Sequence, residues 1–404
     1  MTLLRHLAIA AAVAAAIVLL SIQLGSFREY QMAEVAAYLV AIAGLTVLVG
    51  MSGQISIGHG AFMAIGSYVT ALVILHLGWP LELVFAVSAA SAALVGAVVG
   101  AAAARLRGPY LAGATLMLAV ALPSLASRYA GVFGGDQGLS VSITTPPWLG
   151  FTFPPTRWLA WITWAAVLIT LVLLGNLVRS RIGRSWRAVR DDEVAAALAG
   201  LNVARLQVLA FIISAACAGL GGSLLAVTTN IVSPGEFTLA LSITLLAGAV
   251  LGGLGSIAGA LWASLVLVFL PPYLTNVAAS NGLNSAASSN VPIAVYGVVL
   301  IVVMLVFPSG IQGGLRRFFG VRGPGGLVRA GAPAVGTSLH AWRRPPRHPG
   351  PEATLRGSSP APTRHPGPEA RPSDPSSAPT DHLGSATSHH NPTPASHPHE
   401  EGTV

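Results

Sequence analysis

The sequence predicts an all-α protein that crosses a membrane about ten times, with eight crossings as the lower limit. Hydrophobic residues make up 53% of the 404 residues and charged residues only 9%, whereas a soluble domain usually contains about 25% charged residues. The charges are also unevenly placed, because Glu236 is the only charged residue between Arg205 and Arg316. Long apolar stretches with so few charges are typical of membrane-spanning helices.

Ten segments approach the length of about 20 mostly apolar residues that one crossing needs. In chain order they are Leu7–Leu24, Glu34–Gly50, His59–Leu77, Leu81–Ala104, Leu111–Ser127, Trp158–Val178, Leu206–Thr228, Leu239–Gly253, Ser256–Pro272 and Val291–Phe307. Only glycine and serine turns separate neighbouring segments near residues 50–60 and 253–256, so one or both turns could belong to a broken or re-entrant helix. The first segment could instead be a signal peptide, but it is long and no clear cleavage site follows it. We therefore interpret it as an uncleaved span.

The arginines predict the orientation, because basic residues are enriched in cytoplasmic loops. With ten spans and a cytoplasmic N-terminus, thirteen of the arginines before residue 330 fall in cytoplasmic segments, and only Arg28, Arg128 and Arg157 fall in outer segments. Both termini are therefore expected in the cytoplasm. All 22 basic residues are arginine, which we attribute to genome composition, so the net charge of +8 does not indicate a nucleic-acid partner.

The composition divides the chain into a membrane domain, residues 1–319, and a tail, residues 320–404. The tail is rich in proline, serine, glycine and threonine and holds eight of the eleven histidines. Such a segment cannot bury enough surface to offset its chain entropy, so we expect it to be a disordered cytoplasmic tail. Its histidines could bind a metal, but a disordered tail offers no fixed ligand geometry, and we predict no metal site in the chain.

A glycine-rich stretch between two predicted spans, Gly50–Tyr68, brings polar groups to membrane depth. Its glycines allow a helix break or a close approach of backbones, and transporter sites are often built from such breaks. We therefore predict a break here and a place on the translocation pathway for five residues: Gly53, Gln54, Ser56, Gly58 and His59. The alternative is that the glycines only permit tight packing and that His59 makes a hydrogen bond between helices.

The arginine-rich segment, Arg179–Arg205, is the only long charged stretch among the predicted spans. The spacing of Trp186 and Val194 predicts one helix over residues 185–199, ended by Gly200. A patterned, charged helix between two spans suits the docking of a soluble protein on the cytoplasmic face. The alternative is a loop that only anchors the spans through its arginines.

The charged and small residues of this predicted helix are the candidate docking residues. Arg187 and Asp191 are four residues apart and are expected to pair, while small side chains let a partner surface approach closely. The full set is Arg184, Arg187, Arg190, Asp191, Glu193, Ala195, Ala196 and Gly200.

Several motifs follow one another over residues 30–315. They are Gly50–Tyr68, Arg105–Ala112 with Thr115-Leu116, Gly134–Leu139, the arginine-rich segment continued through Ala210-Phe211, Ser233–Phe237, Leu251–Ser256, Tyr296-Gly297 and Phe307–Gly310. In this order they resemble the permease family of bacterial branched-chain amino acid ABC importers, in particular the longer of its two paired permeases. Each motif alone is weak, but together they are specific for the family.

The resemblance implies an ATP-driven importer in a bacterial cell membrane. It would be built from two permeases, two cytoplasmic ATPases and an extracytoplasmic binding protein, and would move branched-chain or other hydrophobic amino acids. In ABC permeases the docking loop carries the pattern Glu-Ala-Ala-x-x-x-Gly. Ala195, Ala196 and Gly200 fit this pattern, but Val194 stands in place of the glutamate and Glu193 comes one position early. This departure puts a specific role for Glu193 in doubt, and the tail matches nothing in the family pattern.

The chain contains no lysine and therefore no Gly-x-x-x-x-Gly-Lys phosphate-binding loop. We expect it to bind no cofactor and to carry no catalytic residue, with ATP bound by the partner ATPases. Three alternatives stay open: a permease of the same family for urea, short amides or another small solute, an ion-coupled secondary transporter, and an intramembrane enzyme. The secondary transporter requires acids within the spans, where only Glu34 and Glu82 occur, both near span ends. The enzyme requires a nucleophile and a base, for which Cys217 and His59 are poor candidates.

Overall fold

The computed structural model describes residues 25–105, 109–143, 155–280 and 310–318, with single positions between 15 and 23 and between 295 and 305. All of them belong to the first of the two units into which the chain divides, Met1–Arg329. The predicted disordered tail, residues 320–404, lies outside the described residues, as do most of the first and last predicted spans, Leu7–Leu24 and Val291–Phe307.

The described residues are almost entirely helical, which confirms the predicted fold class. The long helices are α2 (Ser26–Ser52), α3 (His59–Leu77), α4 (Leu81–Ala103), α5 (Pro109–Arg128), α7 (Pro155–Arg179), α10 (Val203–Thr229), α11 (Leu239–Gly252) and α12 (Ile257–Ser280). The short elements are α6 (Ala130–Phe133), η1 (Gly135–Gln137), β1 (Leu139–Ser140), α8 (Arg181–Asp191), α9 (Glu193–Leu198), β2 (Ile231–Val232), η2 (Pro234–Glu236) and α14 (Gly310–Phe318).

Within the part that the structure describes, eight helical segments are long and apolar enough to cross a membrane. They correspond to the second through ninth predicted spans. The total number of crossings and the side on which each terminus lies stay predictions, because the first and last predicted spans fall mainly outside the described residues.

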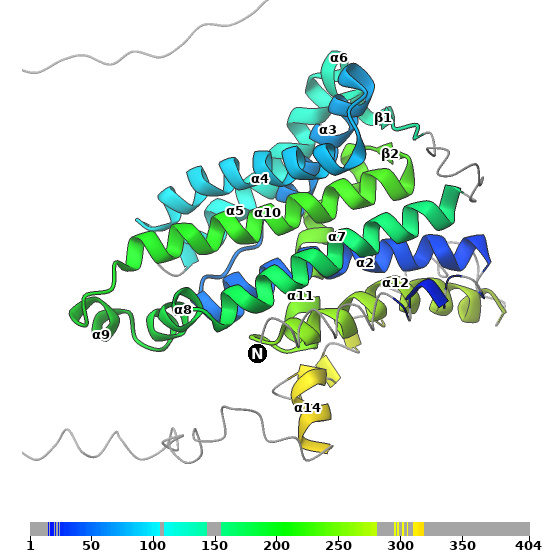
Figure 1. Ribbon diagram of the computed structural model, residues 1–404. Coiled ribbons are helices and arrows are strands. Elements are labelled where there is room, and N and C mark those ends of the chain that lie inside the picture. Colours follow the sequence, from blue (N-terminus) through cyan, green and yellow to red (C-terminus); the bar gives the residue numbers. More distant parts are fainter. Residues whose placement is uncertain are drawn as a thin grey trace, which may run out of the picture. The chain divides into compact units, whose positions relative to one another are not determined.

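Helix α10 lies against α2, α3 and α4 and so occupies the centre of the described bundle (Figure 1). Small residues allow close contacts there. Ser67 on α3 donates a hydrogen bond to the Gly222 carbonyl of α10 (2.6 Å), and Ser214 on α10 donates one to the Gly44 carbonyl of α2 (2.9 Å). Hydroxyl groups that donate to a neighbouring backbone are typical of helix contacts in a membrane, where little water is available.

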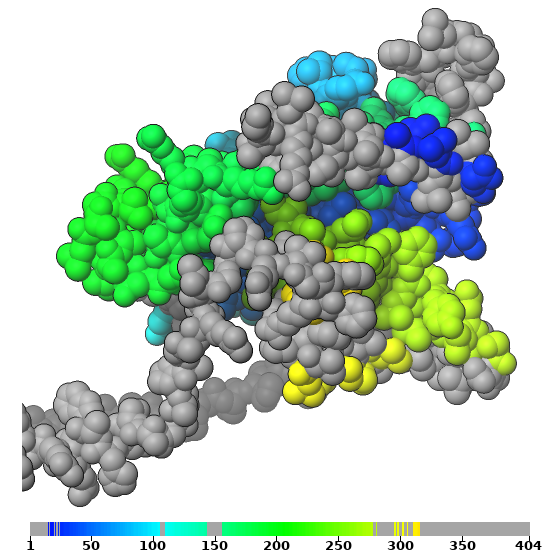
Figure 2. All heavy atoms as spheres, turned by 60° about the horizontal axis from the view of Figure 1, so that its bottom comes forward, coloured from blue at the N-terminus to red at the C-terminus, as the bar shows by residue number. Residues whose placement is uncertain are grey.

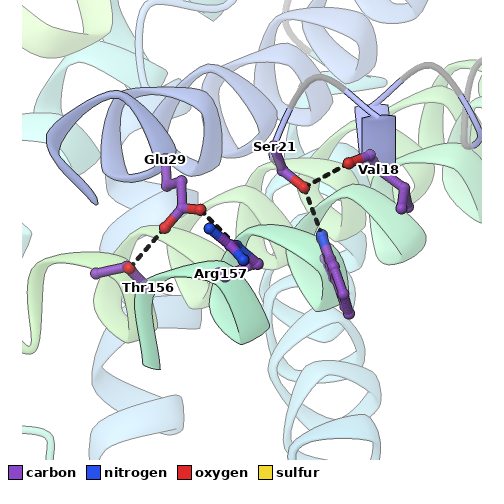
Figure 3. Close-up of polar contacts among 6 residues, drawn as sticks. Val18, Ser21, Glu29, Thr156 and Arg157 are labelled. Carbon is purple, nitrogen blue, oxygen red and sulfur yellow. Dashed lines mark hydrogen bonds and ion pairs between the residues drawn. The ribbon is translucent and has the colours of Figure 1, made fainter. Parts of the chain in front are cut away.

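Helix α2 begins at Ser26, before the predicted start at Glu34. Its polar first turn is helical because the charge of the buried Glu29 is paired there. Arg157 of α7 donates to Glu29 Oε1 and Thr156 donates to Glu29 Oε2, both at 2.8 Å (Figure 3). A buried carboxylate needs such partners, and these contacts fix the start of α2 against the start of α7.

Helix α12 continues through Pro271 and Pro272 to Ser280, beyond the predicted span Ser256–Pro272. The Thr275 hydroxyl donates to the carbonyl of Pro271 (3.0 Å) and supports the turn that follows. Prolines are tolerated inside membrane helices when neighbouring hydroxyl groups support the backbone in this way.

The two ends of the long helices carry different structures (Figure 1). Helices α8 and α9 lie at one end, which we call the arginine-rich end. Helix α6 and the strands lie at the other, which we call the strand end. There β1 pairs with β2 in antiparallel register, with Leu139 opposite Val232 and Ser140 opposite Ile231.

Candidate functional site

The predicted break between α2 and α3 is present and covers Gly53–Gly58, the glycine-rich break. Helix α2 ends where Gly53 takes a left-handed conformation with φ 76°, which glycine adopts without steric cost. The chain then runs through non-helical residues to His59, the first residue of α3.

Polar contacts to other helices fix the path of the break. The Gln54 side-chain amide donates to Ser52 Oγ (3.0 Å) and to the carbonyl of Gln207 on α10 (3.3 Å). The Ile57 N–H donates to Thr115 Oγ1 on α5 (3.0 Å). Backbone groups freed at a break need partners of this kind inside a membrane.

The end of the break packs closely on two further helices. The Gly60 N–H donates to Ser242 Oγ on α11 (3.0 Å). Gly58 lies so close to the Thr115 carbonyl that a Cβ added at Gly58 would overlap that oxygen. Gly58 therefore serves a close approach between the break and α5.

Several polar atoms of the break have no hydrogen-bond partner among the described residues: Gln54 Oε1, Ser56 Oγ and both ring nitrogens of His59. His59 is fully buried, and its ring meets that of Phe62 edge-on with centroids 6.1 Å apart. The Ala41 backbone of α2 lies close enough to interact with the ring, but no hydrogen bond of standard geometry forms. Buried polar atoms without partners are rare, so the break holds unused hydrogen-bonding capacity.

The arginine-rich segment folds as two short helices instead of the single predicted helix. Helix α8 ends at Asp191, α9 begins at Glu193, and Asp192 between them is extended. The Asp192 carboxylate accepts hydrogen bonds from the N–H groups of Val194 and Ala195, both at 2.9 Å. An aspartate that caps a new helix sits in extended backbone, and that backbone interrupts the predicted continuous helix.

Two side chains fix α8 to the long helices. The buried Trp186 donates from Nε1 to the Leu206 carbonyl near the start of α10 (2.8 Å). Arg187 donates to the Val178 carbonyl near the end of α7 (2.7 Å), where the helix dipole favours a cation. The predicted pair between Arg187 and Asp191 is therefore wrong, because Arg187 is engaged by α7.

Arg190 joins the arginine-rich segment to the glycine-rich break. Its Nη1 donates to the Gly50 carbonyl in the last turn of α2 (2.7 Å), and its Nη2 pairs with Asp191 (2.8 Å). Its aliphatic part lies over Gly53, where an added Cβ would come 2.9 Å from Arg190 Cγ. Two groups of residues that the sequence predicted separately thus meet at Arg190.

A cavity of about 300 Å³ lies where the break faces the junction of α8 and α9. It contains members of both predicted sites and is lined by Ser52, Gly53, Gln54, Ile55, Ala103, Leu111, Val189, Arg190, Asp191, Asp192, Glu193 and Gln207. A movement of α8 or α9 would therefore change the surroundings of Gly53 and Gln54.

Helix α9 presents large apolar side chains to the outside. Val194 and Leu198, four residues apart, are 69% and 85% exposed. Ala195 is also exposed, whereas Ala196 faces inward and is buried. Figure 2 shows this part of the chain, in green, at the surface of the left-hand end. Two adjacent apolar side chains beside charged residues suit a contact with another protein.

The other predicted docking residues lie at the edges of this surface. Arg184 is exposed and donates to the Arg179 carbonyl (3.3 Å), and Glu193 is half-exposed. Gly200 is exposed and has φ 85°, with no atom within 4 Å of an added Cβ. Among the described residues, Gly200 therefore serves the turn of the backbone, and no close contact requires its small size.

Sequence reasoning missed the residues that hold the break in place: Thr115, Gln207 and Ser242. Gln207 was the easiest of these to find from the sequence. It is the only amide side chain within α10, and a polar residue inside a span is a signal of function or pairing. Ser242 gave no such signal, and Thr115 was noted only as part of a motif of the family resemblance, since hydroxyl residues are common in membrane helices and usually bond their own backbone.

Comparison with known proteins gives a consistent result. Residues 28–308 match the protein family described as "Branched-chain amino acid transport system / permease component". The chain is similar to the high-affinity branched-chain amino acid transport system permease protein LivM of Escherichia coli (strain K12), with 35% identity over 254 residues, 57% of this chain and 60% of that protein. LivM of Salmonella typhimurium (strain LT2) is 34% identical over the same shares of both chains.

A second kind of permease also matches. LivH of Escherichia coli (strain K12), also named a high-affinity branched-chain amino acid transport system permease protein, is 28% identical over 295 residues, 68% of this chain and 91% of LivH. The match to the LivM proteins spans only 60% of their length. No solved structure matches the chain significantly.

Proposed function

Because the chain belongs to the family of branched-chain amino acid transport permease components, we propose that it is the membrane-spanning permease subunit of an ATP-driven importer. The proposed solutes are branched-chain or other hydrophobic amino acids, taken from an extracytoplasmic binding protein and released into the cytoplasm. The names of the LivM and LivH relatives support this choice of solute.

The proposed assembly contains a second permease, two cytoplasmic ATPases and the binding protein, in a bacterial cell membrane. LivM and LivH of Escherichia coli are both named as permeases of one transport system, which supports a pair of permeases. The chain itself is proposed to be a transport subunit and not an enzyme. It is proposed to bind no ATP, because it lacks the lysine of a phosphate-binding loop.

The observation that carries the proposal is the connection through Arg190. On one side of it, α9 offers the exposed Val194 and Leu198 to a soluble partner. On the other side, the guanidinium holds Gly50 and the side chain covers Gly53. An ATPase that docks on α9 and changes shape during hydrolysis would therefore move the segment between α2 and α3, which is proposed to line the pathway.

The test is reconstitution of the chain in proteoliposomes with the second permease, the ATPases and the binding protein, followed by measurement of leucine uptake. We expect uptake that requires ATP and every one of these subunits. Uptake by the chain alone along a proton or sodium gradient would indicate a secondary transporter instead. ATP-dependent uptake of urea without uptake of leucine would retain the permease and change its solute.

A further inference from the structure

A second cavity lies at the strand end and shares no lining residue with the cavity at the glycine-rich break. Its volume is about 390 Å³. Three parts of the chain surround it: the turn between α3 and α4, the residues that follow β1, and the first turns of α7. A cavity of this size accommodates a small molecule or the head of a larger one, so it is a separate candidate binding site.

The cavity lies where spanning helices begin and end. Helix α3 ends at Leu77, α4 begins at Leu81, and α7 begins at Pro155, and all three are apolar enough to cross a membrane. The ends of such helices lie among the lipid headgroups, where tryptophan is enriched. On the adjoining turns of α3 and α4, Leu75, Leu77 and Leu83 expose apolar side chains. A lipid bound here would place its headgroup in the cavity and its acyl chains along these leucines.

Two indole rings and one carboxylate dominate the lining of the cavity. Trp79 and Trp158 form part of its wall, and Glu82 is the only charged residue that the structure describes there. Glu82 forms no ion pair with a described residue, and Arg157, next to Trp158 in the chain, is engaged by Glu29 (2.8 Å). A carboxylate beside aromatic rings, without a cation of the protein, favours a bound ammonium group.

Trp158 also carries an unused hydrogen-bond donor. Its Nε1–H is buried and has no acceptor among the described residues, and buried polar atoms of this kind are rare in folded proteins. The hydroxyl group of the exposed Ser142 belongs to the same lining. The wall of the cavity thus contains donors for an anionic oxygen as well as an acceptor for an ammonium group.

We propose that this cavity binds the headgroup of an aminophospholipid of the phosphatidylethanolamine type. Glu82 accepts the hydrogen bonds of the ammonium group, and the indole rings of Trp79 and Trp158 add cation–π attraction. The phosphate of the lipid accepts the hydrogen bonds of the donors beside them. Phosphatidylcholine carries three methyl groups in place of the ammonium N–H groups and so donates no hydrogen bond to Glu82. The inference concerns the lipid around the protein and does not depend on the solute that the permease moves.

The test measures the lipid that the full-length protein retains. The protein is purified in detergent, one lipid at a time is added at equal concentration, and native mass spectrometry counts the bound molecules. The probes are phosphatidylethanolamine, its N-methylated forms up to phosphatidylcholine, and phosphatidylglycerol, all with the same acyl chains. We expect the strongest binding for phosphatidylethanolamine, a decrease with each added methyl group, and the weakest binding for phosphatidylglycerol, which has no ammonium group.

Two substitutions test the lining of the cavity. Glu82→Gln should weaken the binding of phosphatidylethanolamine by about two- to fivefold, as for an ion pair at an exposed carboxylate. Trp79→Leu keeps an apolar side chain but removes the ring, and it should weaken the binding of both phosphatidylethanolamine and phosphatidylcholine.

Asp136→Asn is the matched control for the loss of an acid. Asp136 is exposed at the strand end but does not line the cavity, and the amide still accepts the hydrogen bond of Ser127. This variant should retain lipid as the unaltered protein does. Without added lipid, Glu82→Gln should leave the melting temperature unchanged, because the exposed Glu82 side chain has no partner among the described residues.

Three outcomes would overturn the inference. Equal retention of all the lipids by the unaltered protein would mean that the tryptophans belong to a general aromatic belt at the membrane surface. Equal retention of phosphatidylethanolamine by Glu82→Gln and by the unaltered protein would remove the carboxylate from the site. Displacement of bound phosphatidylethanolamine by excess leucine would assign the cavity to the transported solute.

Discussion

The guanidinium of Arg190 donates a 2.7 Å hydrogen bond to the carbonyl of Gly50 and so joins the arginine-rich segment to the last turn of α2. The carbonyls of a last helical turn have no partner within the helix, so this bond satisfies a group that would otherwise need water. It also means that α8 cannot shift without either breaking this contact or moving the end of α2. The contact is therefore the place to test how docking is coupled to transport.

Arg190→Met keeps an aliphatic chain over Gly53 but removes the guanidinium. Since a hydrogen bond from a charged group contributes about 1.5–3 kcal/mol, we expect leucine uptake per ATP hydrolysed to fall by about tenfold while ATP hydrolysis continues. The measurement compares both rates in the same proteoliposomes. Arg205→Met is the control, because Arg205 is exposed and is not one of the candidate docking residues. Unchanged coupling in Arg190→Met would contradict the role assigned to this contact.

Leu198→Asp places a charge on the exposed apolar face of α9. A charge buried in an interface without a partner costs about 3 kcal/mol or more, so the ATPases should no longer co-purify with the permease. Ala188→Asp adds the same charge at an exposed position of α8 and should leave co-purification intact. Gly200→Glu is a poorer variant for this purpose, because φ 85° at Gly200 would strain any other residue. Wild-type yield of ATPases with Leu198→Asp would show that α9 is not the docking surface.

Gly58→Ala tests the close approach of the break to α5. The added methyl group would overlap the Thr115 carbonyl, and overpacking of this kind costs about 1–3 kcal/mol. We expect a lower melting temperature of the purified protein and slower uptake. Gly113→Ala on α5 adds the same methyl group in open space and should change neither value. Equal melting temperatures for the two variants would mean that the break is loosely held.

Glu29→Gln removes one charge from the buried pair with Arg157. The amide can still accept a hydrogen bond from Thr156, but Arg157 loses its counter-charge. Breaking a buried pair from one side costs about 3–5 kcal/mol, and because the Arg157 side chain is 26% exposed we expect the lower end of this range. Thermal unfolding in detergent measures it, with the exposed Glu82→Gln as control. A melting temperature equal to that of the control would mean that α2 and α7 do not depend on the pair.

The class of fold and most of the helix positions follow from local sequence, because membrane helices satisfy their backbone internally and need only a long apolar run. The break at Gly53–Gly58 was also predictable, since several glycines and polar residues interrupt such a run. The cap at Asp192 was a missed local signal, because an acidic residue before Val194 and Ala195 is a common helix start. The expected i,i+4 pair between Arg187 and Asp191 favoured one continuous helix over a new helix that starts after Asp192.

The contacts that unite the candidate site could not be predicted in the same way. Arg190 meets Gly50 across 140 positions of sequence, and no local pattern specifies such a contact.

The pairing of β1 with β2 has a consequence for biosynthesis. Leu139 and Ser140 leave the ribosome long before Ile231 and Val232, and the α7 and α10 helices are made in between. At about 5–20 residues per second, the first strand waits roughly 5–20 s for its partner. The strand end of the molecule therefore closes only after α10 has been inserted, and a nascent chain stopped before residue 231 would still present an unpaired strand edge to chaperones and proteases.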